Sequence, residues 1–148
     1  MKTVKIQSSI LKEKSKVNQK AWIFERYDDY VYIVDPKGHV MYIIHQDKFY
    51  LDIERLDMNV RENLHNLISQ QVIKDSVPAN ITVEKTEDKM TIAKIVANDG
   101  NYCYLNKDNL KNFDKPELRI SGKNKPILMY ENGSLVGMTM PMRVPEEF

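Results

Sequence analysis

Asp52 and Glu54 are the two acidic side chains whose spacing best suits acid–base chemistry. They share one face of a strand predicted over FYLDIE (49–54), because side chains alternate across a strand. General acid–base catalysis also needs a partner within hydrogen-bond reach, and no histidine or third acid accompanies this pair. A solvated strand face is therefore the favoured interpretation, and a small enzyme that uses these two acids is the weaker one.

The histidines and the single cysteine form no recognisable reactive motif. His39, His45 and His65 lie in a predicted turn, at a strand end and on a helix, and none has a metal-ligand spacing such as H-x-x-x-H. Cys103 lies inside a predicted strand, where a small buried residue is favoured over a nucleophile. Glycine-rich phosphate loops and the G-x-S-x-G motif are absent. We therefore predict a non-catalytic protein with no catalytic residue, metal or cofactor.

Lysines at helical spacing are the stronger candidates for a binding site. Lys12 and Lys16 are four residues apart on one predicted helix, and Lys107 and Lys111 are four apart on another. Each helix would present a basic stripe suited to phosphate groups, which carry affinity without sequence information. The alternative is that these lysines are ordinary solvated side chains. If the four line one concave face, we expect weak, salt-dependent binding of double-stranded DNA that is indifferent to sequence.

A methionine-rich segment, SLVGMTMPMRV (134–144), forms the last predicted strand. At a period of two, Met138, Met140 and Met142 share one face, and Pro141 suggests that this end of the strand lies at a sheet edge, because proline cannot donate a ladder hydrogen bond. An exposed face of this kind would offer an adaptable apolar groove. The geometry by itself favours methionines that fill the core.

These residues must be positioned by alternating strand-rich and helical segments. The first half begins with a strand over TVKIQS (3–8) and a basic helix that starts at Ser8 or Ser9 and runs to about Asn18. Four strands then follow: AWIFERY, YVYIV, HVMYIIH and FYLDIE. Asp28-Asp29 and the DPKG sequence at 35–38 predict the first two turns between them.

The second half repeats this pattern after an extra helix. MNVRENLHNLISQQVI (58–73) has apolar residues at helical spacing, which predicts an amphipathic helix. Strands follow Pro78, then a short helix over KDNLKNF that Asn106 or Asp108 could cap. Asn132-Gly133 predicts a tight hairpin between the last two strands. We expect one α+β domain over 1–148, with halves at about 3–56 and 79–144, antiparallel sheets and two short basic helices on one side.

Composition limits the cellular compartment and the kinds of partner expected for this chain. Its 148 residues carry a formal net charge of +1, so nucleic-acid binding would depend on local basic patches. One cysteine excludes an intrachain disulfide framework and suits a reducing compartment. The N-terminal sequence lacks the apolar core of a signal peptide, and no apolar run approaches the roughly 20 residues that span a bilayer. We expect a cytoplasmic protein without a membrane partner.

The segment from 104 to 144 resembles the C-terminal half-domain of the bacterial DNA polymerase sliding clamp, the beta subunit. That family has a tyrosine-leucine start, an "LxxALKxF" helix, a "VELRISG" strand, a "KPxLI" segment and a final strand that ends in "MPMR" plus an aliphatic residue. The matching pieces here are Tyr104-Leu105, Leu110 to Phe113, Glu117 to Gly122, Lys125-Pro126-Ile127-Leu128 and Met140 to Val144. The match covers just over a quarter of the chain.

The resemblance implies a clamp-like domain of two strand–helix–three-strand halves that serves DNA replication or repair without catalysis. It also implies a groove for short peptides of polymerases and repair proteins, lined here by Met138, Met140, Pro141, Met142 and Arg143. Clamp rings contain six domains, so a chain with room for one domain would need six copies and is a possible homo-oligomer. The alternative is a protein–protein interaction module, such as a phage or mobile-element adaptor, that reuses the fold without binding DNA.

Overall fold

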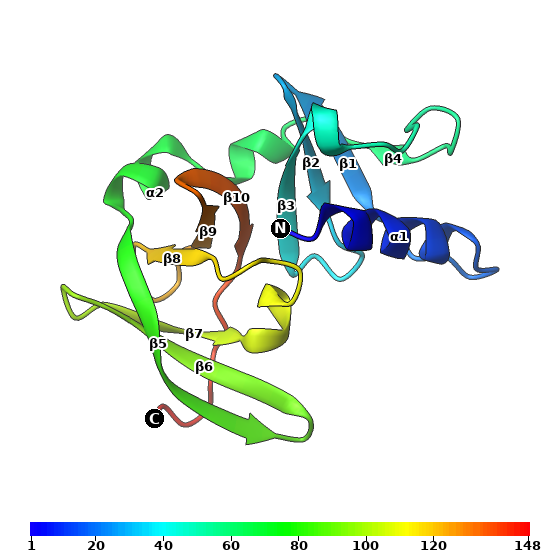
Figure 1. Ribbon diagram of the computed structural model, residues 1–148. Coiled ribbons are helices and arrows are strands. Elements are labelled where there is room, and N and C mark those ends of the chain that lie inside the picture. The colour runs from blue at the N-terminus through cyan, green and yellow to red at the C-terminus, as the bar shows by residue number, and fades with distance from the viewer.

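A computed structural model describes residues 1–148 and shows an α+β fold around one ten-stranded sheet (Figure 1). The two α-helices are α1 (Thr3–Lys14) and α2 (Gln70–Asp75), and three short 3₁₀ helices are η1 (Gln46–Lys48), η2 (Leu64–Leu67) and η3 (Lys107–Leu110). The strands are β1 (Ile23–Tyr27), β2 (Tyr30–Val34), β3 (Val40–His45), β4 (Asn59–Val60), β5 (Val77–Glu87), β6 (Met90–Ala97), β7 (Tyr102–Asn106), β8 (Glu117–Ile120), β9 (Ile127–Glu131) and β10 (Ser134–Thr139).

The sheet joins the two halves of the chain through its central strands. Its order is β4-β1-β2-β3-β10-β9-β8-β5-β6-β7, and all neighbours are antiparallel except β4 and β1. The N-terminal strands β1–β3 meet the C-terminal strands where β3 pairs with β10, with Tyr42 opposite Gly137 and Val40 opposite Thr139. In Figure 1 this junction lies between one group of strands beside α1 and a second group that ends in the long β5–β6 hairpin.

The turns follow the local sequence signals. Tyr27 pairs with Tyr30 across the Asp28-Asp29 turn, and Glu131 pairs with Ser134 across Asn132-Gly133. Asn132 and Gly133 both have positive φ values, 51° and 78°, as a two-residue hairpin turn of this type requires. These two turns, and a third at 35–38, confirm the sequence predictions.

The first predicted strand, TVKIQS (3–8), is wrong, because these residues open α1. Val4 and Ile6 alternate like strand residues, yet Val4 is 67% exposed while Ile6 and Ile10 are buried. Burial four residues apart is the helical pattern, and it turns one face of α1 toward the core. The helix also ends earlier than predicted, at Lys14, so Lys16 lies just beyond it.

The predicted helix at 58–73 is also wrong and is replaced by β4, η2 and α2. Asn63 has a left-handed conformation with φ of 69°, which interrupts a helix. Ser69 then caps α2 by accepting a hydrogen bond from the Val72 amide. Leu64 and Ile68 are buried, but Val60 and Leu67, which the same spacing placed on the inward face, are 57% and 49% exposed. The apolar spacing therefore located only part of the inward side chains.

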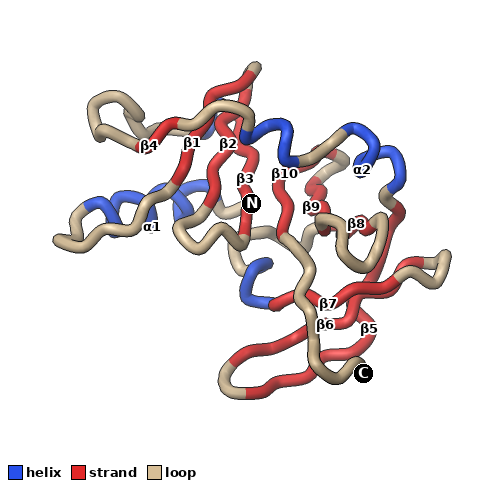
Figure 2. Tube along the Cα trace, turned by 180° about the vertical axis from the view of Figure 1, so that it is seen from behind, coloured by secondary structure: helices blue, strands red, loops and turns tan.

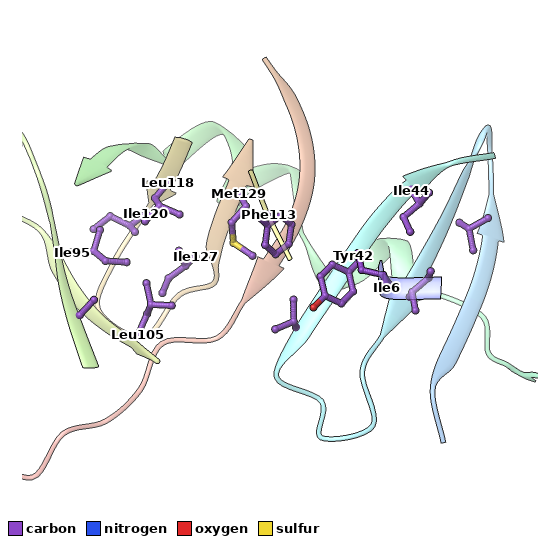
Figure 3. Packing of buried hydrophobic residues seen from close by; sticks show 14 of the residues in the cluster. Ile6, Tyr42, Ile44, Ile95, Leu105, Phe113, Leu118, Ile120, Ile127 and Met129 are labelled. Atoms are coloured by element: carbon purple, nitrogen blue, oxygen red, sulfur yellow. The ribbon is translucent and has the colours of Figure 1, made fainter. Parts of the chain in front are cut away.

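Apolar side chains pack on both faces of the sheet. The larger cluster lies on the side of α1 and includes Ile6 and Ile10, whereas a smaller cluster lies beneath the 64–73 segment. In Figure 3 the larger cluster crosses from one half to the other, and Tyr42 and Phe113 meet between them with ring centroids 5.4 Å apart. A shared core and a continuous sheet therefore hold the two halves together.

Candidate functional site: a lysine-lined groove

Three of the four lysines predicted to face DNA line one groove. Lys12 and Lys16 come from α1 and the residues after it, and Lys111 comes from the end of η3. The groove has a volume of about 570 Å³ and is also lined by Lys20 and Lys37. Lysines from opposite ends of the chain therefore converge on one concave surface.

The fourth predicted lysine, Lys107, lies in an adjoining depression of about 500 Å³ together with Lys89. The two hollows share Met90, Asn106, Asp108 and Lys111 along their walls, so they form one continuous surface. We call this surface the basic groove. Its lysines are Lys12, Lys16, Lys20, Lys37, Lys89, Lys107 and Lys111.

Acidic side chains neutralise part of this charge. Lys16 is 2.8 Å from Glu13 and Lys107 is 2.7 Å from Glu84, while Lys111 lies 3.6 Å from Asp108. The pKa of the Glu13 carboxyl is lowered, chiefly because the Lys16 ammonium group donates a hydrogen bond to it, so Glu13 stays ionised at neutral pH.

The remaining lysines keep the groove positive. The four that form no ion pair with an acidic side chain are Lys12, Lys20, Lys37 and Lys89. Only one further carboxylate, Asp35, lines the groove, and it accepts the backbone N–H groups of His39 and Val40. A surface with this excess of cations attracts polyanions such as a phosphate backbone.

Backbone contacts hold the two lysine-bearing elements in a fixed relation. The Lys2 amide donates to the Asn112 carbonyl at 2.8 Å, and Lys2 Nζ donates to the Lys111 carbonyl at 3.0 Å. Asn106, one of the two caps that the sequence predicted, accepts the Asp108 amide at the start of η3. The element is a short 3₁₀ helix that ends at Leu110 and does not extend to Phe113. The start of α1 is thus tied directly to the chain that follows η3.

Two polar atoms in the groove are buried without a hydrogen-bond partner: Nε1 of Trp22 and Oδ1 of Asn112. Asn112 is 6% exposed, and its amide nitrogen donates to the Tyr42 hydroxyl at 3.0 Å. Sequence reasoning missed both residues. The one available signal was that the only tryptophan stands two positions after Lys20. Buried polar atoms usually find partners, so these two are exceptions among the residues that line the groove.

The residues predicted to form a peptide groove are not presented on one strand face. β10 ends at Thr139 and lies between β3 and β9, so the prediction of a sheet edge at Pro141 is wrong. The register shifts between Leu135 and Gly137, and this bulge turns Val136 toward the larger cluster and Met138 toward the smaller one. The bulge lies before Met138, so it separates only Val136 from the predicted face. The alternation fails beyond Met138 because β10 ends at Thr139 and the residues from Met140 to Arg143 are no longer part of that strand.

The five residues predicted to line a peptide groove differ in how deeply they are buried. Met138 is 9% exposed and belongs to the core, whereas Met140 is 47% exposed. Pro141 and Met142 are half-buried, and Arg143 is exposed. None of the five lines the main surface cavities.

The segment after β10 folds back along β7, as the chain near the C terminus shows in Figure 2. The Met142 amide donates to the Tyr104 carbonyl at 2.8 Å. Phe148 packs on the Tyr104 ring with centroids 5.0 Å apart, and its amide donates to the Tyr104 hydroxyl. Glu147 accepts a hydrogen bond from the Tyr102 hydroxyl. Phe148 is thus packed against β7 of its own chain.

The residues considered for catalysis lie apart from the basic groove. The strand predicted over 49–54 is absent, and Asp52 instead accepts the Arg55 amide in a turn. Both Asp52 and Glu54 are exposed and line a separate hollow. Cys103 is fully buried, and burial raises the pKa of its thiol to about 12.

The histidines are also separate from one another. His65 bonds to Glu25, His45 accepts the Asp47 amide through its ring, and His39 lines the basic groove. No group of three or more histidine, cysteine, aspartate or glutamate side chains is placed to hold a metal ion. None of the helices has both the length and the apolarity needed to cross a membrane.

No family model, curated protein or solved structure matches this chain.

Proposed function

We propose that this chain is a non-catalytic accessory protein of DNA replication or repair that binds DNA through the basic groove. The observation that carries the proposal is the convergence of Lys12 and Lys16 with Lys111, which come from distant parts of the sequence. Five of the 18 residues that line the main hollow of the groove are lysines, against 17 of 148 in the whole chain. The lysines unpaired with acids supply charge for phosphate contacts.

The arrangement of the C-terminal half supports a clamp-like origin for this function. Strand β7 is followed by η3 and then by the antiparallel strands β8, β9 and β10, which is the order that the resemblance at 104–144 implies. Leu110 and Phe113 pack against the same cluster as Ile6 and Ile10 of α1, so both lysine-bearing elements lie on one side of the sheet. A clamp-like domain would use this side to face DNA.

The physical character of the groove sets the expected affinity. Lysine–phosphate contacts release counterions, so binding weakens steeply as salt rises and shows no preference for base sequence. Contacts from the four unpaired lysines predict a slope of about −3 to −4 for log K against log salt on duplex DNA, and a shallower one on a single strand. With a formal net charge of only +1, long-range attraction beyond the groove is weak.

Fluorescence anisotropy of a short labelled DNA duplex and of its separate strand, measured over a salt series, tests the proposal. Replacing Lys12, Lys20, Lys37 and Lys89, the four groove lysines without an ion pair, with alanine should abolish binding at low salt. The matched control replaces four exposed lysines outside the groove: Lys5, Lys48, Lys74 and Lys125. Equal binding by both variants, or no binding of either DNA form by the parent, would refute the function.

Peptide binding is the second part of the proposed function and has narrower support. Met140 and Arg143 are the two exposed members of the predicted groove. A peptide with a glutamine and a terminal leucine-phenylalanine pair, the clamp-binding type, should bind at micromolar strength, about −8 kcal/mol, and Met140→Ala should weaken it. Isothermal titration of parent and variant measures this. An unchanged affinity in the variant would place the peptide elsewhere.

The alternative function, an interaction module that does not bind DNA, has one specific observation in its favour. Strand β7 is the end strand of the sheet, and Met142 already makes a backbone hydrogen bond to it. An edge that accepts an extended segment in this way can recognise a partner by strand addition. Peptide binding without any DNA binding in the assays above would select this alternative.

A further inference from the structure

The basic groove continues into a smaller cavity next to α1. This cavity has a volume of about 160 Å³, and half of its lining is apolar. Its apolar lining residues are Ile10, Ala21, Trp22, Phe24 and Met58. Lys20 and Trp22 line both the cavity and the groove, so the two spaces meet at these side chains. We call the smaller space the Trp22 cavity.

We infer that the basic groove binds single-stranded nucleic acid and that the Trp22 cavity takes one unstacked base. This inference rests on the proposed function and names the form of nucleic acid that the groove accepts. Single strands are bound by basic channels that follow the backbone and by aromatic side chains that contact the bases. A duplex keeps its bases stacked and paired, so it could offer only phosphates to the groove.

The size and lining of the cavity match a base. An apolar cavity of about 150 Å³ accepts one benzene ring, so the Trp22 cavity is large enough for a six-membered ring such as that of a pyrimidine. Phe24 and Met58 supply an apolar environment for it. Lys14 also lines the cavity, and its Nζ donates a hydrogen bond to the Asp57 carbonyl at 3.0 Å. This bond connects α1 to the 57–59 segment.

The side chains that line the Trp22 cavity favour a base over a bare phosphate. Trp22 and Phe24 offer aromatic surface that suits the flat face of a base. A charged phosphate would lose its hydration against these apolar side chains. Lys20, at the junction, is placed to contact the phosphate next to the inserted base.

The inference is tested with three labelled ligands of equal length: an oligothymidylate, an abasic strand with the same phosphodiester backbone, and a duplex. Anisotropy should show roughly tenfold or tighter binding of the oligothymidylate than of the abasic strand, because base contacts are lost in the latter. The emission of Trp22, the only tryptophan, should change with the oligothymidylate and not with the abasic strand.

Two variants test whether the preference for the oligothymidylate depends on the Trp22 cavity. Ala21→Phe should fill the cavity and remove the advantage of the oligothymidylate while leaving abasic binding unchanged. Trp22→Leu should reduce the advantage through loss of aromatic surface. Leu11→Phe, on an exposed residue of α1 outside the cavity, is the matched control and should behave like the parent. Circular dichroism verifies the fold of each variant.

The outcomes separate the inference from the proposed function. Equal binding of the oligothymidylate and the abasic strand, with no effect of either cavity variant, would overturn the inference while leaving phosphate binding in the groove intact. Tighter binding of the duplex than of the single strand would also overturn it. Absence of binding to all three ligands would refute the proposed function itself.

Discussion

Gly137 lies directly against the ring of Phe113, at the junction where β10 pairs with β3. A Cβ atom at position 137 would be 2.7 Å from Phe113 Cζ and 2.6 Å from the carbonyl oxygen of Met41. Only glycine leaves this space open. The contact lets the segment after η3 lie on the central strands and so helps to fix one wall of the basic groove.

Gly137→Ala should therefore lower the free energy of unfolding by about 1–3 kcal/mol, the usual cost of overpacking. The clash involves backbone at Met41 as well as the Phe113 ring, so rotation of one side chain cannot relieve it. Urea denaturation measures the change. Gly122→Ala is the control, because a Cβ there would meet only the flexible Lys125 side chain, at 3.2 Å. Equal stabilities of the two variants would contradict the prediction.

Glu25 gives the protein a pH-dependent link between β1 and the η2 segment. Its buried carboxylate accepts the backbone N–H groups of Asn63 and His65 and lies 2.6 Å from His65 Nδ1. Burial by itself raises the pKa of this carboxyl, but the hydrogen bonds outweigh it and hold the pKa below its ordinary value of 4.5. A lowered pKa stabilises the fold above pH 4.5, and the contribution disappears as the pH falls through the folded-state pKa.

Glu25→Gln should accordingly reduce stability at pH 7 by about 1.5–3 kcal/mol, the usual contribution of hydrogen bonds to a charged group. The difference from the parent should shrink in acid, and urea titrations at pH 7 and about pH 3 compare the two conditions. Glu62→Gln, on an exposed residue of the same region, should have little effect at either pH. A difference between parent and Glu25→Gln that stays constant with pH would contradict the linkage.

Cys103 should be unreactive in the native protein. Its side chain is fully buried and its thiol has a pKa of about 12, so almost no thiolate is available at pH 8. A thiol reagent should label it only when the protein unfolds, with a rate that rises with denaturant. Val17→Cys in a Cys103→Ala background should react at once, because position 17 is 99% exposed. Native labelling of Cys103 at a similar rate would show that β7 is accessible.

Met138 and Met140 should differ in how much they contribute to stability. Met138→Ala should cost about 2–5 kcal/mol of stability, because Met138 packs against Met41 and Leu128 in the smaller cluster. Met140→Ala should cost less than about 0.5 kcal/mol, since the side chain is 47% exposed. Thermal or chemical melts of the two variants decide this, and similar losses at both positions would show that Met140 is also part of the core.

The sequence by itself determined the local features of this protein. Asp28-Asp29 and Asn132-Gly133 specify tight turns through residues that tolerate positive φ, and the strands between them follow from their apolar content. The α+β class and a cap at Asn106 or Asp108 were predictable for the same reason, and the structure uses Asn106. Each depends on residues within a few positions of one another.

The tertiary structure decided which of these features face each other. Residues 3–8 alternate like a strand, but burial of Ile6 and Ile10 against the same core selects the helix. The bulge between Leu135 and Gly137 places Val136 and Met138 on opposite faces, at the point where Gly137 lies against Phe113 and Met41. Strand pairing and core packing join segments far apart in the chain, and no local pattern encodes the relative placement of those segments. For that reason the sequence identified lysines on two elements, and only the fold brought Lys12 and Lys111 into one groove beside Trp22.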